Sequence, residues 1–119
     1  MKDKKKWMMA AAAAAGALIG RICYECRHFT TEYYDVTSDK IPEAFEGFRF
    51  VVLSDLHNYD FDQGNRQLLR AIERLKPDAV MIAGDMIDAH PGADMSAAVR
   101  MVRDLCDRWP VYFGNGNHE

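Results

Sequence analysis

Three short stretches of the sequence carry side chains of the kind that bind metal ions and phosphate. They are S-D-L-H at 54–57, G-D-M-I-D at 84–88 and G-N-G-N-H-E at 114–119. Carboxylate, imidazole and amide groups together suit hard or borderline divalent cations such as manganese, iron or zinc. Asp55 and His57 could reach a common ion, because residues two apart can turn to one side where a chain leaves a strand. Asp85 has two carboxylate oxygens and could bridge two metals.

The third stretch adds a neutral ligand, the side-chain oxygen of Asn117, and an imidazole, His118. Asp88 and Glu119 fit a supporting role, in which a carboxylate fixes the tautomer and direction of an imidazole. Each stretch alone is a weak signal, since Gly-Asp is ordinary turn chemistry and an Asp or His after a strand is usually solvated. Their occurrence together, in predicted structural context, favours a metal site.

The elements between these stretches explain how they could meet. Apolar runs predict strands at 48–54, at 78–85 and from 111 onward, and amphipathic patterns predict helices at 65–76 and 94–109. The first run is continuous, as in a parallel strand covered by helices on both faces. The stretches recur at roughly 30 residues, the length of one βαβ unit. Parallel strands place their C-terminal ends along one edge, where open α/β sheets bind ligands.

The N-terminal segment, 1–24, has a basic head followed by an uncharged stretch from Trp7 to Gly20. This stretch is shorter than the roughly 20 apolar residues of a membrane span. It fits a signal peptide, or an anchor extending to about Tyr24 if Arg21 reaches the headgroups. The anchor is preferred, because the A-x-A cleavage patterns lie inside the alanine run. Either way the lysines stay cytoplasmic and the body lies outside the membrane.

Residues 25–46 are rich in Thr, Tyr and Val, and this composition predicts a linker with an edge strand.

Three cysteines are too few for a disulfide framework. Cys23 and Cys26 form a single C-x-x-C without the second pair of a structural zinc site, which leaves a local disulfide, lipidation or two idle thiols. Cys106 falls on the apolar face of the second helix and is expected to be buried.

Charge sets limits on the partners. The net charge is −3, and because the first 21 residues are positive, the remainder is strongly acidic. An acidic body argues against general nucleic-acid binding, which needs clustered Lys and Arg. If the chain binds a phosphate, metal cations must make the local charge of the binding site positive.

The runs F-R-F-V-V-L-S-D-L-H-N, P-D-A-V-M-I-A-G-D-M-I-D and V-Y-F-G-N-G-N-H-E together resemble the calcineurin-like metallophosphoesterase family over 47–119. The N-terminal part is similar to membrane-anchored or exported bacterial members. The resemblance implies an α/β fold of the αββα sandwich type, with only its N-terminal half in this chain. It makes Asp55 and His57 ligands of one metal, Asp85 the bridge and Asn117 a ligand of the second metal. His118 would be the catalytic residue that contacts the scissile phosphate or protonates its leaving group.

The activity implied is hydrolysis of a phosphomonoester or phosphodiester by a water bridging two divalent metal ions (manganese, iron or zinc). A lipid-linked phosphoester or a nucleotide-sugar diphosphate is the expected kind of substrate. The family's downstream histidine motifs do not follow, so the chain is expected to be a fragment, poorly active alone, with sheet faces left bare. The alternative is a non-catalytic, membrane-tethered interaction module on the same scaffold.

Overall fold

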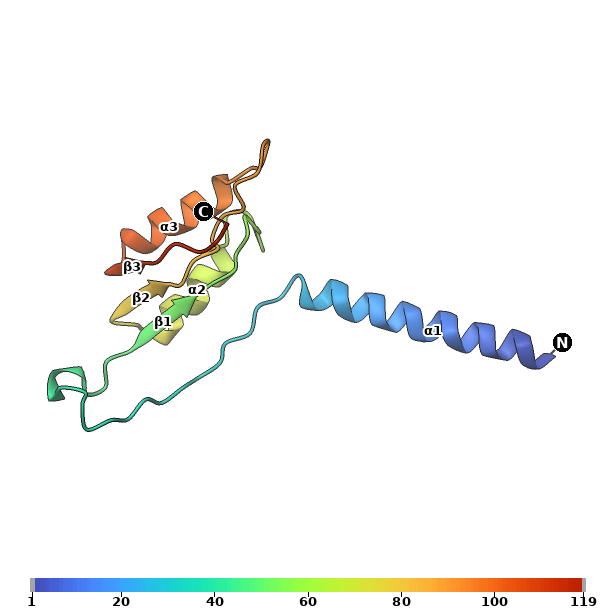
Figure 1. The fold of residues 1–119 in the computed structure, drawn as a ribbon, viewed down its shortest axis with the longest axis horizontal. Coiled ribbons are helices and arrows are strands. Elements are labelled where there is room, and N and C mark those ends of the chain that lie inside the picture. The colour runs from blue at the N-terminus through green and yellow to red at the C-terminus, as the bar shows by residue number, and fades with distance from the viewer. Residues whose placement is uncertain (1, 119) are drawn as a thin grey trace. The chain divides into compact units, whose positions relative to one another are not determined.

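The computed structural model describes residues 2–118 (Figure 1). The element order is α1 (Lys2–Glu25), the 3-10 helix η1 (Glu43–Phe45), β1 (Phe50–Leu53), α2 (Arg66–Leu75), β2 (Ala79–Ile82), α3 (Ser96–Cys106) and β3 (Val111–Phe113). Two compact units divide the chain, Met1–Tyr34 and Asp35–Glu119. Each is described by itself.

The first unit is built on α1, which is one continuous helix through the alanine run. Alanine has the highest helix propensity of all residues, so the run favours this helix without help from packing. The segment Lys4–Glu25 is long and apolar enough to cross a membrane, and none of its apolar window is buried against the protein. Length and composition alone support a span, and a signal sequence near the N-terminus passes the same test.

The edge strand expected within residues 25–46 is not formed. Between α1 and β1, the described chain contains η1, a few turns and otherwise irregular coil. Tyr33, Tyr34 and Val36 are 79%, 80% and 78% exposed. Tyr and Val have high β propensity, but a strand also needs a neighbour to complete its hydrogen-bond ladder, and no described strand pairs with this segment.

The second unit is centred on a three-stranded parallel sheet in the order β1-β2-β3. Val52 pairs with Met81, which pairs with Tyr112, so the three strands are in register and end together. The prediction of three parallel strands joined by two helices is therefore confirmed. The third strand ends at Phe113, and the G-N-G-N-H stretch that follows is loop.

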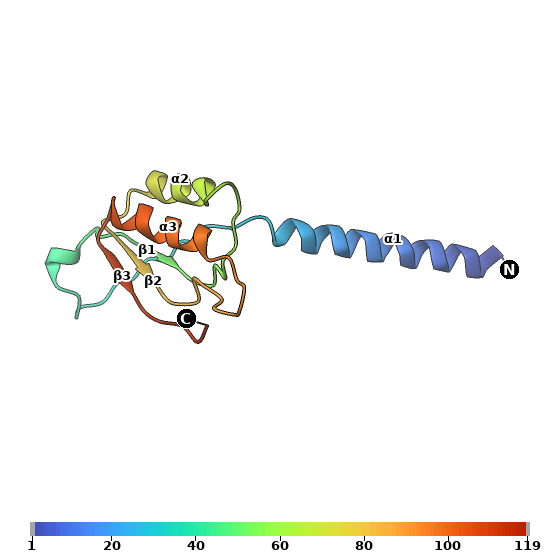
Figure 2. The same cartoon turned by 90° about the horizontal axis from the view of Figure 1, so that it is seen from above.

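Both crossover helices, α2 and α3, lie on the same side of the sheet (Figure 2). Between them and the sheet lies the core, in which Ile72, Val80, Met101 and Leu105 are at most 2% exposed. An ion pair between Arg108 and Glu73 joins the end of α3 to α2. Apolar burial under two parallel helices is the main force that holds the strand ends in place.

The opposite face of the sheet is apolar and open. Phe50, Val52, Met81 and Tyr112 are 46%, 61%, 40% and 60% exposed. Within the described part of the second unit, residues 35–118, α-helices therefore cover only one face of the sheet that contains β1. A bare face is what the resemblance led us to expect.

A tight turn sets the start of α2. The carboxylate of Asp60 accepts hydrogen bonds from the backbone N–H groups of Asp62 (3.1 Å), Gly64 (2.8 Å) and Asn65 (3.0 Å). Asn65 is fully buried, and its side chain bonds to the backbone of Tyr59 and Phe61. The turn thereby satisfies backbone donors that precede the helix.

Cys106 is exposed, against expectation. The buried stripe of α3 is formed by Ala97, Ala98, Met101 and Leu105. Cys106 follows Leu105 by one position, about 100° further around the helix, and it is the last residue of α3. The apolar stripe is narrower than the sequence pattern indicated.

Candidate metal centre

The loop after β1 is bonded along its length to the loop after β2. The backbone N–H of His57 donates to the carbonyl of Asp85 at 3.0 Å, and that of Asn58 donates to the carbonyl of Met86 at 3.1 Å. The backbone N–H of Asp55 reaches the carbonyl of Gly84 at 3.3 Å. These bonds continue the parallel pairing of β1 and β2 past the strand ends, so the D-x-H and G-D stretches are held side by side.

The loops after β1 and β2 have an unusual backbone conformation at four positions. Asp55, His57, Asn58 and Asp85 have φ values of 58°, 46°, 60° and 54°. Non-glycine residues seldom adopt the left-handed region, and Asn, Asp and His tolerate it best. Such conformations cluster at functional sites, where the surrounding structure holds them in place and they can be part of the mechanism.

Two glycines allow the loops after β2 and β3 to touch. A Cβ on Gly84, whose φ is +97°, would lie 2.5 Å from the backbone nitrogen of Gly116. A Cβ on Gly116 would lie 2.5 Å from the backbone nitrogen of Asp85 and would overlap its carboxylate. Only glycine at both positions permits this approach, which brings the third stretch to the first two.

Asp85 is the link between the second and third stretches. One carboxylate oxygen of Asp85 accepts a hydrogen bond from the backbone N–H of His118 at 3.0 Å. The backbone N–H of Ala89 donates in return to the carbonyl of His118 at 3.3 Å. The half-buried Asp85 is therefore held from two sides, by the loop after β1 and by the loop after β3.

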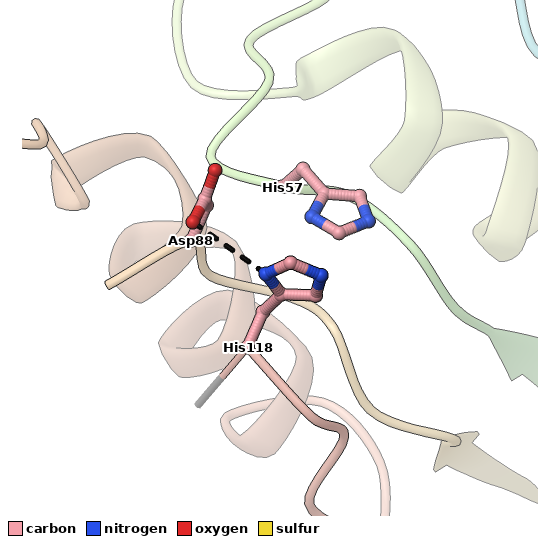
Figure 3. Close-up of side chains that lie close together, drawn as sticks. All are labelled: His57, Asp88 and His118. Carbon is pink, nitrogen blue, oxygen red and sulfur yellow. Dashed lines mark ion pairs between the residues drawn. The ribbon is translucent and has the colours of Figure 1, made fainter. Parts of the chain in front are cut away.

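The side chains converge at this edge (Figure 3). Asp88 Oδ1 lies 3.7 Å from His118 Nδ1, and the rings of His57 and His118 meet edge to face with centroids 5.0 Å apart. Asp55 Oδ1 lies 3.6 Å from His57 Nε2, and the hydroxyl of Ser54 donates to the other Asp55 oxygen. Carboxylates and imidazoles from three strand ends thus share one small volume.

Two overlapping groups could each hold a cation. Asp55, His57 and Asp85 form one, and His57, Asp88 and His118 form the other; within each group, one donor atom per residue lies within 4.8 Å of the others. Ligands about 2.0–2.2 Å from one tetrahedral ion lie about 3.4 Å apart, so side-chain rotations would have to bring the more distant donor atoms about 1 Å closer. The donor set therefore fits a divalent ion without large movement of the backbone.

Five of the sequence-predicted residues are brought together: Asp55, His57, Asp85, Asp88 and His118. Asn117 is exposed in the loop after β3, next to His118 in the chain. Glu119 lies outside the described residues. By distance alone, His57 belongs to both groups and Asp88 to one of them, whereas the sequence predicted a supporting role for Asp88.

Asn58 is a residue that the sequence reasoning missed. Its side-chain nitrogen donates to the backbone carbonyl of Asp88 at 2.9 Å, and so joins the loop after β1 to the carboxylate beside His118. Its side-chain oxygen is buried without a protein partner. In the sequence, only its position directly after D-x-H pointed to a role of Asn58 at this site.

Comparison with known proteins agrees with this geometry. The family model described as calcineurin-like phosphoesterase matches residues 48–119, more than half of the chain. The chain belongs to this family. Its members are phosphoesterase hydrolases that generally bind divalent metals, in keeping with the His and Asp groups at the sheet edge.

Several relatives of this metallophosphoesterase chain share its sequence at moderate identity. A zebrafish (Danio rerio) transmembrane protein with metallophosphoesterase domain is 34% identical over 71% of the chain, and its Bos taurus counterpart is 30% identical over 71%. The Bacillus subtilis metallophosphoesterase YkuE is 34% identical over 68%. The matched parts are 20%, 19% and 29% of these relatives' lengths. No solved structure matches the chain.

Proposed function

We propose that this chain supplies metal-binding loops of a phosphoesterase that hydrolyses a phosphomonoester or phosphodiester with the help of two divalent cations. The proposal rests on one observation: two clusters of carboxylate and imidazole side chains, which share His57, lie at the carboxyl ends of three parallel strands. Manganese, iron and zinc all accept such mixed oxygen and nitrogen donors.

In this proposal Asp55 and His57 hold one ion, Asp85 lies between the two, and Asn117 supplies an oxygen to the second. Asp85 is suited to the bridging position because the residue is half-buried between two loops: its backbone carbonyl bonds to the loop after β1 and its carboxylate bonds to the loop after β3. When bound, the cations would supply the positive charge that attracts a phosphate to this acidic chain and that acidifies a water molecule.

His118 is proposed to act on the phosphate or its leaving group. Its Nδ1 faces the Asp88 carboxylate at 3.7 Å, which leaves Nε2 as the nitrogen available to a substrate. A carboxylate behind an imidazole favours the tautomer with a proton on the near nitrogen and stabilises the charged ring. With both ring nitrogens protonated, His118 can donate from Nε2 a hydrogen bond to a phosphoryl oxygen or a proton to the departing oxygen.

The substrate class is proposed from α1 and from the relatives' names. Two relatives are named as transmembrane proteins, and Lys4–Glu25 could span a bilayer. Lys4, Lys5 and Lys6 at its start favour a cytoplasmic N-terminus, with the metal-binding unit on the other side. A protein so placed, whether anchored or released by signal cleavage, suits a lipid-linked phosphoester or a nucleotide-sugar diphosphate.

The test uses the purified chain and manganese as the probe. Titration calorimetry should show Mn²⁺ binding that Asp85→Asn weakens at least tenfold, while far-ultraviolet circular dichroism of the variant stays unchanged. Hydrolysis of bis(p-nitrophenyl) phosphate should be slow, dependent on Mn²⁺, and lost in the variant. Equal Mn²⁺ affinity in the two proteins would reject Asp85 as a ligand. Tight binding without any hydrolysis would favour the non-catalytic module.

A further inference from the structure

Two thiols lie on one side of the end of α1. Cys23 is in the last turn of the helix, and Cys26 is the first residue after it. The backbone N–H of Cys26 still donates to the carbonyl of Ile22 at 2.9 Å, so the helical path continues through Cys26. Helical residues three apart share a face, with Cβ atoms about 5–6 Å apart. Both cysteines are exposed and free in the structure.

The chain leaves the α-helix directly after this pair, so its backbone there is no longer held by regular α-helical hydrogen bonds. The N–H of Arg27 donates to the carbonyl of Tyr24 at 3.0 Å, and that of His28 donates to the carbonyl of Glu25 at 3.4 Å. These are the shorter-range bonds of a 3-10 turn. A disulfide needs Cβ atoms about 3.5–4.5 Å apart, so the turn must contract by about 1 Å. Little resists this contraction, because the described residues of α1 are exposed throughout.

We propose that Cys23 and Cys26 are a redox-active pair that closes to an intramolecular disulfide at the end of α1. A small-molecule disulfide such as oxidised glutathione is the co-reactant. The thiolate of one cysteine attacks a sulfur of that disulfide, forms a mixed disulfide and expels one glutathione thiolate. The second cysteine then attacks the protein sulfur of the mixed disulfide and expels the other. Two cysteine thiols are oxidised, one disulfide is reduced to two thiols, and the two cysteine protons pass to the two leaving thiolates.

The position of the pair makes it a reversible switch rather than a structural staple. It encloses only two residues, so the chain entropy that it removes from the unfolded state is small. Exposed disulfides with strained geometry are reduced easily, and these are the ones that act as regulatory or catalytic pairs. The proposal is independent of the phosphoesterase activity, because no residue of the metal centre takes part.

The test is thiol trapping in the full chain. The protein, in detergent micelles, is equilibrated in glutathione buffers of increasing oxidised fraction, alkylated and digested for mass spectrometry. Cys23 and Cys26 should lose alkylation together and yield a peptide lacking two hydrogens, and excess reduced glutathione should restore both thiols. In Cys23→Ser, Cys26 should carry glutathione instead. Cys106→Ser is the matched control, since Cys106 is also exposed but lies in the other unit, and this variant should retain the transition.

Three outcomes would overturn the proposal. Independent glutathionylation of Cys23 and Cys26 in the parent chain would show that the turn does not close. Crosslinks between two chains would show an intermolecular bond. A pair that stays oxidised in excess reduced glutathione would be a structural disulfide, not a redox-active one.

Discussion

Replacing Gly84 with alanine tests whether the approach of two loops builds the metal centre. Two separate costs follow from the structure. The φ of +97° is strained for any residue with a Cβ, and the new Cβ would lie 2.5 Å from the nitrogen of Gly116. Ordinary contacts begin near 3.4 Å, so the loops after β2 and β3 must separate by about 1 Å.

Gly92 offers a matched control. Its φ is +85°, and a Cβ there would meet nothing within 4 Å. Gly92→Ala should therefore cost only the left-handed strain, about 1–2 kcal/mol of unfolding free energy. Gly84→Ala should cost this amount plus about 1–3 kcal/mol for the overlap.

Urea unfolding and manganese titration separate these contributions. Because Gly84 precedes Asp85 and its carbonyl accepts the N–H of Asp55, a shift of the loop displaces both carboxylates. We expect Gly84→Ala to weaken Mn²⁺ binding by about 10- to 100-fold, the range seen when the support of a ligand is lost. Gly92→Ala should bind Mn²⁺ as the parent does. If both variants lose the same stability and keep the same affinity, loop contact does not build the site.

Four further changes probe the core, the turns and the loop contact. Met101→Ala, at a fully buried position, should lower the unfolding free energy by about 2–5 kcal/mol in urea titrations. Asp60→Ala should cost about 1–3 kcal/mol in the same assay by leaving the backbone N–H groups before α2 unpaired, and Asp60→Asn should cost less. The backbone N–H of Ser96 donates to the Asp94 carboxylate and lowers the pKa of Asp94 below its ordinary 3.8. The stability that Asp94 adds is therefore present above pH 3.8 and is lost as the pH falls through the lowered pKa. Urea midpoints of the parent and Asp94→Asn should differ at about pH 5 and converge in stronger acid. Asn58→Ala removes the side-chain hydrogen bond to the backbone of Asp88 but keeps the backbone bonds between the loops after β1 and β2, and calorimetry should show weaker Mn²⁺ binding with little change in the core.

The parallel sheet and its two helices could be predicted because their signals are local. Apolar runs of strand length and helical stripes such as Leu68, Leu69 and Ile72 recur at βαβ spacing, and all three of these residues are buried. Partner-dependent features were not predictable. Tyr33 and Tyr34 have strand propensity, but the described residues form no strand that pairs with them. The exposure of Cys106 depends on where α3 ends relative to the core.

At the metal centre, the sequence supplied the donors but not the contacts between them. The meeting of Gly84 with Gly116 depends on the register of β2 and β3, and no spacing along the chain reports a distance across two loops. His57 belongs to both groups of candidate ligands for the same reason, because some of its neighbours come from other strand ends. Such contacts become visible only when the strands are paired.

The choice of residues at these strand ends satisfies two demands at once. The loops must enter left-handed backbone conformations, and the side chains must offer oxygen or nitrogen to a cation. Asp, Asn and His are the non-glycine residues that best accept the first demand, and they are also ligands. A β-branched residue at Asp55 or Asp85 would fail on both counts, whereas glycine would meet only the backbone demand. Asp85→Gly should therefore abolish Mn²⁺ binding with a smaller loss of unfolding free energy than Asp85→Val, and the reverse order would mean that the positive φ at Asp85 carries no strain.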